Sequence, residues 1–355
     1  MLKKRLLYFY PEPSSFIEKD ILIFEKYFRL KHFSFSPSKK YFLFYFFLRQ
    51  ILQLLRYGFS ARCIVVRFGG YHALLPMLFA KVFNRPSILI VGGTEAHYFP
   101  SIHYGSSTNK LYGWATGMSL RLARHLAPVD ESLIEHTYTY DPEFPARQGI
   151  RNVYPAVRTP FTAIHNGYDA KGFSIIEGKK RTPRSFLTVA NVAKDFEYYL
   201  KGIDLVLEMA GLFPDCSFTI AGNPSSRIDL ARFPNVVLAG KIEYSRLVEL
   251  YNSQEFYLQL SVAEGFPNTL CEAMLCGCIP IGSDVFSIPK IIGDTGFVLK
   301  HRNSGELKQL IEVALGANGE ELSLKARKKI AENYSFQRRE KELLELISSL
   351  TVVSK

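Results

Sequence analysis

Short apolar runs alternate with longer helix-like segments along the whole chain. The runs of the first half lie at 5–10, 63–67 and 87–91, with weaker ones at 125–128 and 161–164, and those of the second half lie at 186–190, 217–221, 236–239, 256–260 and 278–281. This alternation is typical of βαβ units, which build a parallel sheet covered by helices on both faces. A length of 355 residues fits two such domains. We therefore predict an α/β protein with two doubly wound domains in series.

The two halves of the chain differ in charge. Residues 1–167 contain 21 Lys and Arg against 10 Asp and Glu, a net charge of +11, whereas the rest of the chain has 23 of each. The pair Asn166-Gly167, a strong turn signal, lies at this change. We therefore predict an N-terminal domain over 1–167, a C-terminal domain over 168–334 and a final amphipathic helix over 335–355.

The basic composition limits the partners without choosing one. A sequence pI near 9.3 indicates a polyanion, which leaves nucleic acid, anionic lipid and a phosphorylated substrate open at this point. The five cysteines form an odd set that suits reduced thiols in a cytoplasmic protein. Cys276 and Cys278 lack a second ligand pair at zinc-like spacing, so we predict no metal site there. The apolar run 41–48 is cut by Arg49 and Gln50, so we predict no bilayer span.

The segment 261–280 contains the residues that most directly indicate chemistry. It reads as strand end, turn, helix, turn and strand, with Glu264 in the turn and Glu272 about two helical turns later. Gly265 lets the backbone approach a ligand closely, and a helix N-terminus favours an anion. The backbone N–H groups that we expect to face this anion belong to Phe266, Asn268 and Thr269.

Two carboxylates beside an anion site are costly unless hydroxyl groups donate hydrogen bonds to them. A sugar nucleotide supplies both the phosphate and the hydroxyls. The alternative for either glutamate taken alone is a surface helix whose acidic N-terminus is favoured by the helix dipole.

Taken together, these residues resemble the E-x7-E signature of GT-B glycosyltransferases of the family 4 type. Glu264 and Glu272 match its spacing, and the segment 187–191 with Lys201-Gly202 is similar to the family's strand and diphosphate-binding lysine. Asn191 stands where the family usually has Arg, with Lys194 close by, and Lys does not fully replace that bidentate donor. Gly222 follows the next strand, and Ile242 matches the part that frames the nucleotide base.

The N-terminal half matches the family only in layout. The loop 92–97 follows an apolar run and resembles the family's acceptor-side loop, which implies that Glu95 or His97 faces the donor sugar. The alternative is an ordinary loop carboxylate and a solvated histidine. The earlier pair Gly69-Gly70 favours helix-start packing over a phosphate contact.

The resemblance implies a GT-B fold, with two Rossmann-like domains facing across a cleft and a C-terminal helix that crosses back to the N-terminal domain. It also implies transfer of a sugar from a nucleotide donor to an acceptor hydroxyl, with retention, no cofactor and no essential metal. In this interpretation Lys201 and the turn amides stabilise the leaving diphosphate. Glu272 holds the ribose hydroxyls, and Glu264 holds hydroxyls of the donor sugar.

The basic, aromatic N-terminal half is then the acceptor side. Lys39 and Lys40 precede the run 41–48, and Arg49 and Arg56 follow it, so this face suits an anionic membrane and a lipid-linked or cell-surface glycan precursor, as in polysaccharide or lipopolysaccharide assembly. The alternative is a buried helix with solvated ends. We expect a cytoplasmic protein that is peripheral on the inner face of the plasma membrane and binds no nucleic acid.

Two other functional classes stay open. A GT-B nucleotide-sugar epimerase would use the same nucleotide site without an acceptor. A non-catalytic protein that binds membrane or nucleic acid would keep the scaffold alone.

Overall fold

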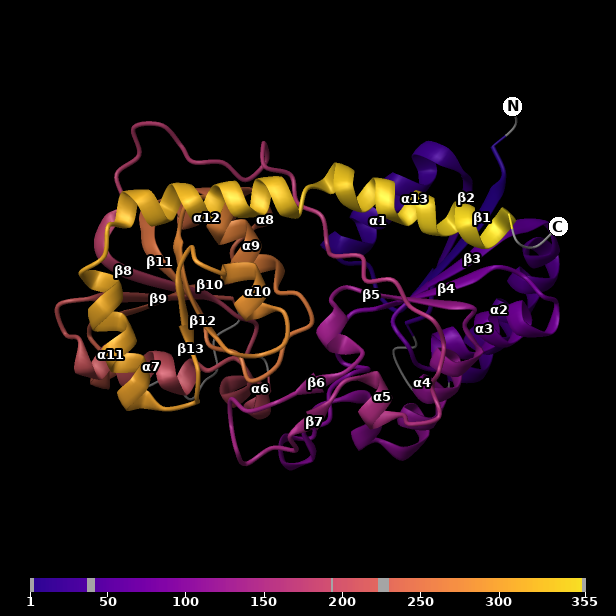
Figure 1. The fold of residues 1–355 in the computed structure, drawn as a ribbon, viewed down its shortest axis with the longest axis horizontal. Helices are drawn as coiled ribbons and strands as arrows, with labels where there is room; N and C mark the ends of the chain where they lie inside the picture. Colours follow the sequence, from indigo (N-terminus) through magenta and orange to yellow (C-terminus); the bar gives the residue numbers. More distant parts are fainter. Residues whose placement is uncertain (1–2, 37–41, 193, 223–229, 353–355) are drawn as a thin grey trace. The chain divides into compact units, whose positions relative to one another are not determined.

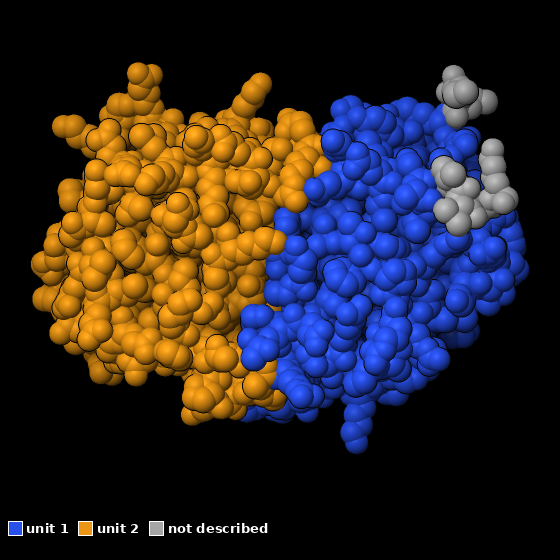
Figure 2. Space-filling model, viewed as in Figure 1, with its two compact units in different colours: residues 1–137, 147–166, 339–355 blue, residues 138–146, 167–338 orange. Residues whose placement is uncertain are grey.

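The computed structural model describes residues 3–36, 42–192, 194–222 and 230–352, and it divides into two compact units. Unit 1 comprises residues 1–137, 147–166 and 339–355, and unit 2 comprises 138–146 and 167–338 (Figure 2). Each unit has its own parallel sheet and its own core.

The sheet of unit 1 has five parallel strands in the order β2-β1-β3-β4-β5. They are β1 (Arg5–Tyr10), β2 (Arg29–Ser34), β3 (Ala61–Arg67), β4 (Ser87–Val91) and β5 (His125–Pro128). All five side chains of β4 are buried, as expected for a central strand with helices on both faces. In Figure 1, α1 and α13 lie on one side of this sheet and α2, α3 and α4 on the other.

The helices of unit 1 are α1 (Ser15–Tyr27), α2 (Leu43–Tyr57), α3 (Tyr71–Val82), α4 (Lys110–Leu122), α5 (Ile150–Val153) and α13 (Phe336–Val352), the last beginning in unit 2. Shorter elements are the 3-10 turns η2 (Gly58–Ser60), η3 (Pro100–Ile102), η4 (Ser106–Thr108) and η5 (Glu131–Leu133), and the antiparallel pair β6 (His136–Thr137) and β7 (Arg147–Gln148).

The sheet of unit 2 has six parallel strands in the order β10-β9-β8-β11-β12-β13. They are β8 (Thr182–Val189), β9 (Ser217–Ala221), β10 (Val236–Gly240), β11 (Gln254–Gln259), β12 (Ile279–Ser283) and β13 (Phe297–Leu299). Buried rings from three neighbouring strands stack in its core: Phe186 lies 5.0 Å from Phe218 and 4.9 Å from Phe256, centroid to centroid.

The helices of unit 2 are α6 (Asp195–Leu200), α7 (Ile203–Leu212), α8 (Tyr244–Ser253), α9 (Asn268–Leu275), α10 (Ile288–Ile292), α11 (Ser304–Leu315) and α12 (Gly319–Asn333), with the short turn η6 (Leu230–Arg232). Figure 1 shows α7 and α11 together on one side of the sheet and α9 and α12 together on the other. The predicted α/β class, with two parallel, doubly wound sheets, is thereby confirmed.

For the two parallel sheets, the predicted strands differ from the structure in three details. Residues 161–164 form no strand, and Phe161 makes only an isolated bridge to Leu126. Strand β2 was not predicted because it is an edge strand whose sequence RLKHFS contains no continuous apolar run and has no fully buried residue. Strand β13 was missed because it has only three residues.

The segment 138–146, which we expected in the N-terminal domain, belongs to unit 2. Its Asp141 accepts a hydrogen bond from Tyr199 Oη at 2.5 Å, and Arg302 N donates to Tyr140 O at 2.7 Å. The Tyr138 ring also lies 6.4 Å from that of Phe286. The sequence offered no sign of these long-range contacts, so the whole segment was placed with its neighbours in the chain.

Residues 339–352 of α13 belong to unit 1 although the chain before them belongs to unit 2. Arg339 holds them there through Nε and Nη2, which donate to the two carboxylate oxygens of Asp20 on α1 at 2.8 and 3.0 Å. Its Nη1 donates to the carbonyl oxygens of Ile164 and His165 at 3.1 and 3.0 Å. The C-terminal helix thus begins in one unit and is anchored in the other, as the resemblance implied.

Within the described residues, none of the helices combines the length and the apolar character needed to cross a bilayer.

Candidate active site

The strand order of unit 2 identifies the edge at which sheets of this topology bind their ligands. The chain leaves β8 towards β9 and β10 on one side, and then returns to place β11, β12 and β13 on the other. Parallel α/β sheets bind ligands beyond the carboxyl ends of the strands where this direction reverses. In unit 2 that point lies between β8 and β11. Lys201 follows β8 and Glu264 follows β11.

A close approach of two backbone segments brings Lys201 to this edge. Gly202 follows α6 with a φ of +68°, a conformation that favours glycine, and a Cβ there would lie 2.3 Å from Leu260 O. Val262 N also donates to Leu200 O at 2.8 Å. The end of α6 is therefore fixed against the loop after β11, with Lys201 at the contact.

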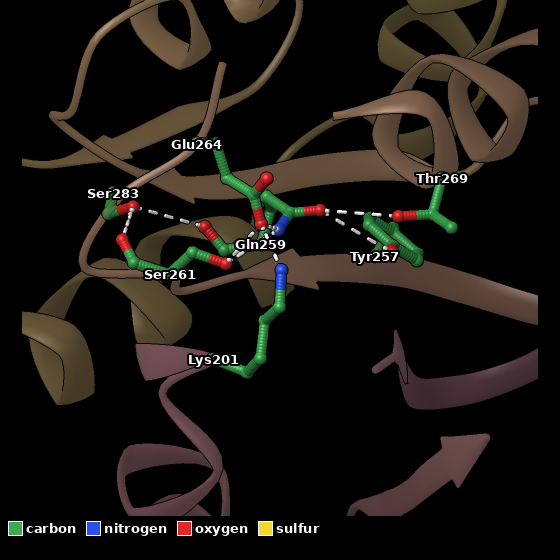
Figure 3. A network of polar contacts seen from close by, with 7 residues as sticks. All are labelled: Lys201, Tyr257, Gln259, Ser261, Glu264, Thr269 and Ser283. Atoms are coloured by element: carbon green, nitrogen blue, oxygen red, sulfur yellow. Dashed lines mark hydrogen bonds and ion pairs between the residues drawn. The ribbon is translucent and has the colours of Figure 1, made fainter. Parts of the chain in front are cut away.

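Lys201 and Glu264 form an ion pair at the centre of a polar network (Figure 3). Lys201 Nζ lies 2.6 Å from Glu264 Oε1, and the same oxygen accepts from Ser261 Oγ at 2.9 Å and from Gln259 Nε2 at 3.3 Å. The side chains are 28% exposed for Lys201 and 16% for Glu264. Both charges are therefore fixed in direction yet reachable from solvent.

The network is supported from below by the strand ends. Gln259 Nε2 donates to Ser261 Oγ at 2.8 Å, and Ser283 Oγ at the end of β12 donates to Ser261 O at 2.6 Å. Gln259 Oε1 lies 3.5 Å from both Thr269 Oγ1 and Tyr257 Oη, which connects β11 to the first turn of α9. Figure 3 shows these groups converging on the carboxyl end of β11.

Glu272 lies on α9, with 3% of its surface exposed. It accepts a hydrogen bond from Tyr244, the first residue of α8, and this bond and its charge add to burial in raising the pKa of the Tyr244 hydroxyl. Burial is also the main reason that the pKa of Tyr257 is raised, with smaller contributions from the charges of Glu264 and Glu272. Tyr257 therefore lies near both carboxylates, which the structure brings into one region.

The turn between β11 and α9 is held by aromatic packing. The buried Phe266 ring lies 6.3 Å from Tyr168 and 5.2 Å from Tyr334, and Tyr168 Oη donates to Asn268 Oδ1 at 2.7 Å. The side chains of Phe266 and Asn268 thus serve the turn itself. Their backbone N–H groups lie next to Gly265 and the first turn of α9.

The other predicted donor-binding residues lie along the same edge of the sheet. Asn191 is exposed beyond β8, and Lys194 precedes α6 and is exposed as well. Gly222, beyond β9, has a φ of +127°, and a Cβ there would lie 1.9 Å from Ala190 O. Ile242 is half-buried beyond β10. The structure therefore brings every predicted residue of unit 2 to one edge.

Glu95 and His97 belong to unit 1 and are both buried. Glu95 Oε1 accepts from Gly69 N at 2.9 Å and Oε2 from Gly93 N at 3.1 Å, so its carboxyl group joins the two glycine loops. Burial raises its pKa, while these amides and Arg67 oppose the rise. His97 packs beside Tyr104 and Phe99 at ring distances of 5.6 and 6.1 Å. Neither residue is the solvated loop group of the alternative interpretation.

The described residues contain one cluster with metal-ligand geometry, formed in unit 1 by Asp130, Glu131 and His165 within 4.8 Å of one another. Asp130 Oδ1 caps η5 through Ser132 N at 3.0 Å, and His165 Nδ1 bonds Val129 O at 2.7 Å, so both have structural tasks.

Cys276 and Cys278 of unit 2 are buried free thiols. Burial raises the pKa of Cys276 and of Cys278 to about 12, so both are neutral thiols near pH 7. Cys278 Sγ donates to Tyr251 O at 3.0 Å.

Gln259, Ser261 and Tyr244 were missed by the sequence analysis. Gln259 and Ser261 alternate at the end of an apolar run, so their side chains share a face with period two, and this polar pair was the available signal. Tyr244 offers no such signal, because its contact with Glu272 joins two helices that are distant in the chain.

Residues 176–334 match the family described as glycosyl transferases group 1. These residues all lie in unit 2. A curated relative, one of the subunits of phosphatidylinositol N-acetylglucosaminyltransferase in Arabidopsis thaliana, is 22% identical over 277 residues, which are 70% of this chain and 59% of that protein. The chain therefore spans less than two thirds of that relative's length.

Two solved structures share the fold of this chain. Sucrose-phosphate synthase from Thermosynechococcus elongatus superposes with a TM-score of 0.75 and 12% identity, covering 99% of this chain and 100% of the other. HepE from Anabaena in complex with UDP superposes with a TM-score of 0.71 and 12% identity, covering 97% and 100%. The fold is GT-B, as the sequence predicted.

Proposed function

We propose that this protein is a retaining glycosyltransferase that moves a sugar from a nucleotide donor to an acceptor hydroxyl. The observation that carries the proposal is the Lys201–Glu264 ion pair, 2.6 Å long, at the switch point between β8 and β11 of a group 1 domain. It presents a cation for a diphosphate and a carboxylate for sugar hydroxyls at one edge. The bound UDP of the similar HepE structure supports a nucleotide as the donor's leaving group.

Each carboxylate takes a different part of the donor. Glu272, beside Tyr244 at the start of α8, holds the ribose hydroxyls, and Tyr244 helps to frame the nucleoside. Glu264 accepts hydrogen bonds from hydroxyls of the donor sugar. Gln259 and Ser261 keep its carboxylate pointing to the reacting carbon, because both already donate to Oε1. The anomeric carbon is thereby placed beside Lys201.

The reaction breaks the bond between the anomeric carbon and the diphosphate oxygen and forms a bond from that carbon to the acceptor oxygen on the same face. The acceptor's proton passes to the leaving phosphate oxygen, so no protein base is required. Lys201 and the first-turn amides of α9 stabilise the negative charge that develops on the diphosphate. Since Lys201 supplies the positive charge that compensates the diphosphate, we propose that no metal is needed. A chelator should therefore leave the rate unchanged.

We propose a lipid-linked or cell-surface glycan precursor as the acceptor, and the inner face of the plasma membrane as the place of action. The name of the Arabidopsis relative includes the phospholipid phosphatidylinositol, which supports this class. The charge of residues 1–167, 21 basic against 10 acidic groups, suits an anionic surface. Five buried free cysteines suit a reducing compartment.

A binding experiment tests the donor site. A thermal-shift screen of UDP-, GDP- and ADP-sugars on the full chain identifies a stabilising donor, and calorimetry then measures its affinity. We expect Glu272→Ala to abolish this binding, whereas Glu312→Ala, which removes a half-exposed carboxylate from α11, leaves it unchanged. Equal affinity in wild type and Glu272→Ala would refute the proposed site.

The epimerase alternative makes a different prediction. An epimerase converts the donor sugar when donor is the only substrate, whereas the proposed transferase needs an acceptor to do so. Isomerised donor in the absence of acceptor, measured by NMR, would therefore replace the proposal.

A further inference from the structure

The solvent face of α2 is apolar where a surface helix is usually polar. Phe44, Tyr45, Leu52 and Leu55 are 77%, 57%, 60% and 54% exposed. The apolar stripe that we name the α2 face consists of Phe44, Tyr45, Leu48, Ile51, Leu52 and Leu55. Its members recur every three or four residues, so they line one side of the helix. The structure thereby excludes the buried helix that the sequence analysis kept as the alternative.

The opposite side of α2 holds the helix on unit 1. Leu54 and Gln50 are buried there, and Gln50 Nε2 donates to His72 O at the start of α3 at 2.8 Å. The rings of Phe46 and Phe47 each lie 5.3 Å from that of the buried Phe35. The helix is thus fixed in rotation, and the exposure of the α2 face does not arise from a loosely attached segment.

The apolar surface continues past the end of α2. Phe59 in η2 is exposed, and its ring lies 4.8 Å from that of Phe83, which follows α3 and is exposed as well. Val82 beside it is 64% exposed. Figure 1 shows α2 and α3 next to each other in unit 1. An apolar surface of this extent marks an interaction site.

Charge identifies the occupant. Residues 26–94 contain 11 Lys and Arg and no Asp or Glu. Arg49 and Arg56 are exposed on α2 itself, and Lys81 is exposed on α3. A protein partner would need a carboxylate opposite each of these cations. The phosphates of an anionic bilayer can pair with the cations at any position along the surface. Aromatic and leucine side chains beside Arg and Lys are the composition of helices that lie in a lipid interface.

The length of α2 decides how it meets the bilayer. Its 15 residues extend about 22 Å at 1.5 Å per residue, less than the ~30 Å hydrocarbon core. A helix of this length lies in the membrane plane and buries one face.

We propose that the α2 face inserts into the headgroup and upper acyl region of an anionic bilayer, with Arg49 and Arg56 at the phosphates. This inference rests on the proposed function for its purpose, since it brings unit 1 to a lipid-linked acceptor. It differs from a purely electrostatic attachment because the apolar side chains enter the bilayer. Lys39 and Lys40, which the sequence analysis placed next to this helix, lie outside the described residues.

A single-tryptophan reporter tests insertion. Trp114 is the only tryptophan of the chain, so Trp114→Phe with Phe44→Trp leaves one indole, on the α2 face. The matched reporter is Trp114→Phe with Leu22→Trp, because Leu22 is 63% exposed on α1, on the other side of the same sheet. With vesicles of phosphatidylglycerol and phosphatidylcholine, we expect a blue shift and quenching by brominated acyl chains at position 44 only. Unquenched emission at position 44 would overturn the proposal.

Vesicle sedimentation of the full chain measures the contribution of the face. We expect Phe44→Glu with Leu52→Glu to weaken binding at least tenfold, and Leu22→Glu to leave it unchanged. Raising NaCl to 0.5 M should weaken wild-type binding without abolishing it, since insertion is not screened by salt. The proposal is refuted if the wild type does not sediment with the vesicles. It is also refuted if sedimentation velocity shows that the wild type dimerises through the α2 face. Donor calorimetry on the same variants should be unaltered, so a failure here is separate from a failure of the donor site.

Discussion

The two units share a parallel, doubly wound sheet, but each contains a different kind of charged cluster. In unit 2, the side chains of the pair Lys201–Glu264 are 28% and 16% exposed, and the pair lies at the proposed donor site. In unit 1, Asp20 is fully buried between two arginines, Arg339 and Arg67, the latter at the end of β3. One arrangement is open to a ligand, and the other is closed by the C-terminal helix.

The physical difference is desolvation. A partly exposed ion pair keeps much of its hydration, so either partner can exchange the other for a ligand at small cost. A buried carboxylate between two guanidinium groups cannot, because removing one partner leaves an uncompensated charge in the interior. The same residue types therefore stabilise unit 1 and, in the proposed function, bind the donor in unit 2.

The largest effect is expected at the closed site. Asp20→Ala leaves Arg339 and Arg67 buried without their carboxylate, so we expect the free energy of unfolding to fall by about 3–5 kcal/mol. Urea denaturation followed by circular dichroism measures this loss. The matched control is Glu340→Ala, which removes a second contact between the same two helices: Glu340 Oε1 lies 2.7 Å from Lys26 Nζ, and Lys26 is 61% exposed. We expect a much smaller loss from that control, because water solvates the exposed lysine in either state. Equal losses in the two variants would remove the distinction between closed and open sites.

The open site should show the reverse behaviour. Lys201→Ala and Glu264→Ala each remove a group that acts on the transition state, so we expect kcat to fall by about 10²–10³-fold. Unfolding should change by no more than about 1 kcal/mol, as for a partly exposed pair.

The matched control for the open site is Lys300→Ala. Lys300 Nζ forms a similar ion pair with Asp284 at 2.9 Å in the same unit, and its loss should leave kcat unchanged. Initial rates with the donor found by thermal shift give kcat for the two site variants and for this control. If Lys201→Ala lowered the free energy of unfolding by as much as it raised the activation free energy of the reaction, the pair would have a structural role.

The sequence contains patterns for the residues of the open site and none for those of the closed one. Glu264 and Glu272 could be found because they match the E-x7-E signature of the family that the chain resembles, and Lys201 because it matches the family's diphosphate-binding lysine. Asp20 and Arg339 are 319 residues apart, and neither differs from an ordinary surface charge in its local sequence. The same reason hid the role of Glu95, whose two partners are the amides of separate loops. Contacts that only the folded chain creates leave no local pattern.

The smallest effect is expected at a buried histidine of unit 1. His72, at the start of α3, bonds Arg67 O through Nε2 at 2.7 Å, and burial lowers its pKa from 6.5 to about 4. The unfolded chain therefore takes up a proton near pH 6.5 that the folded chain refuses until about pH 4. Stability from this group is complete above pH 6.5 and is lost as the pH falls through that interval.

Between pH 7 and pH 5 we expect a loss of about 2 kcal/mol from His72 alone. Urea denaturation at the two pH values, for wild type and for His72→Gln, isolates this contribution, because other titrating groups cancel in the difference. Glu95 is one of these groups, and its raised pKa acts in the opposite direction by favouring the folded state at low pH. An identical pH dependence in the two proteins would mean that His72 has the same pKa in the folded and the unfolded chain, so that it takes up its proton while unit 1 stays folded. The buried polar groups of this unit would then tolerate charge as the open site of unit 2 does.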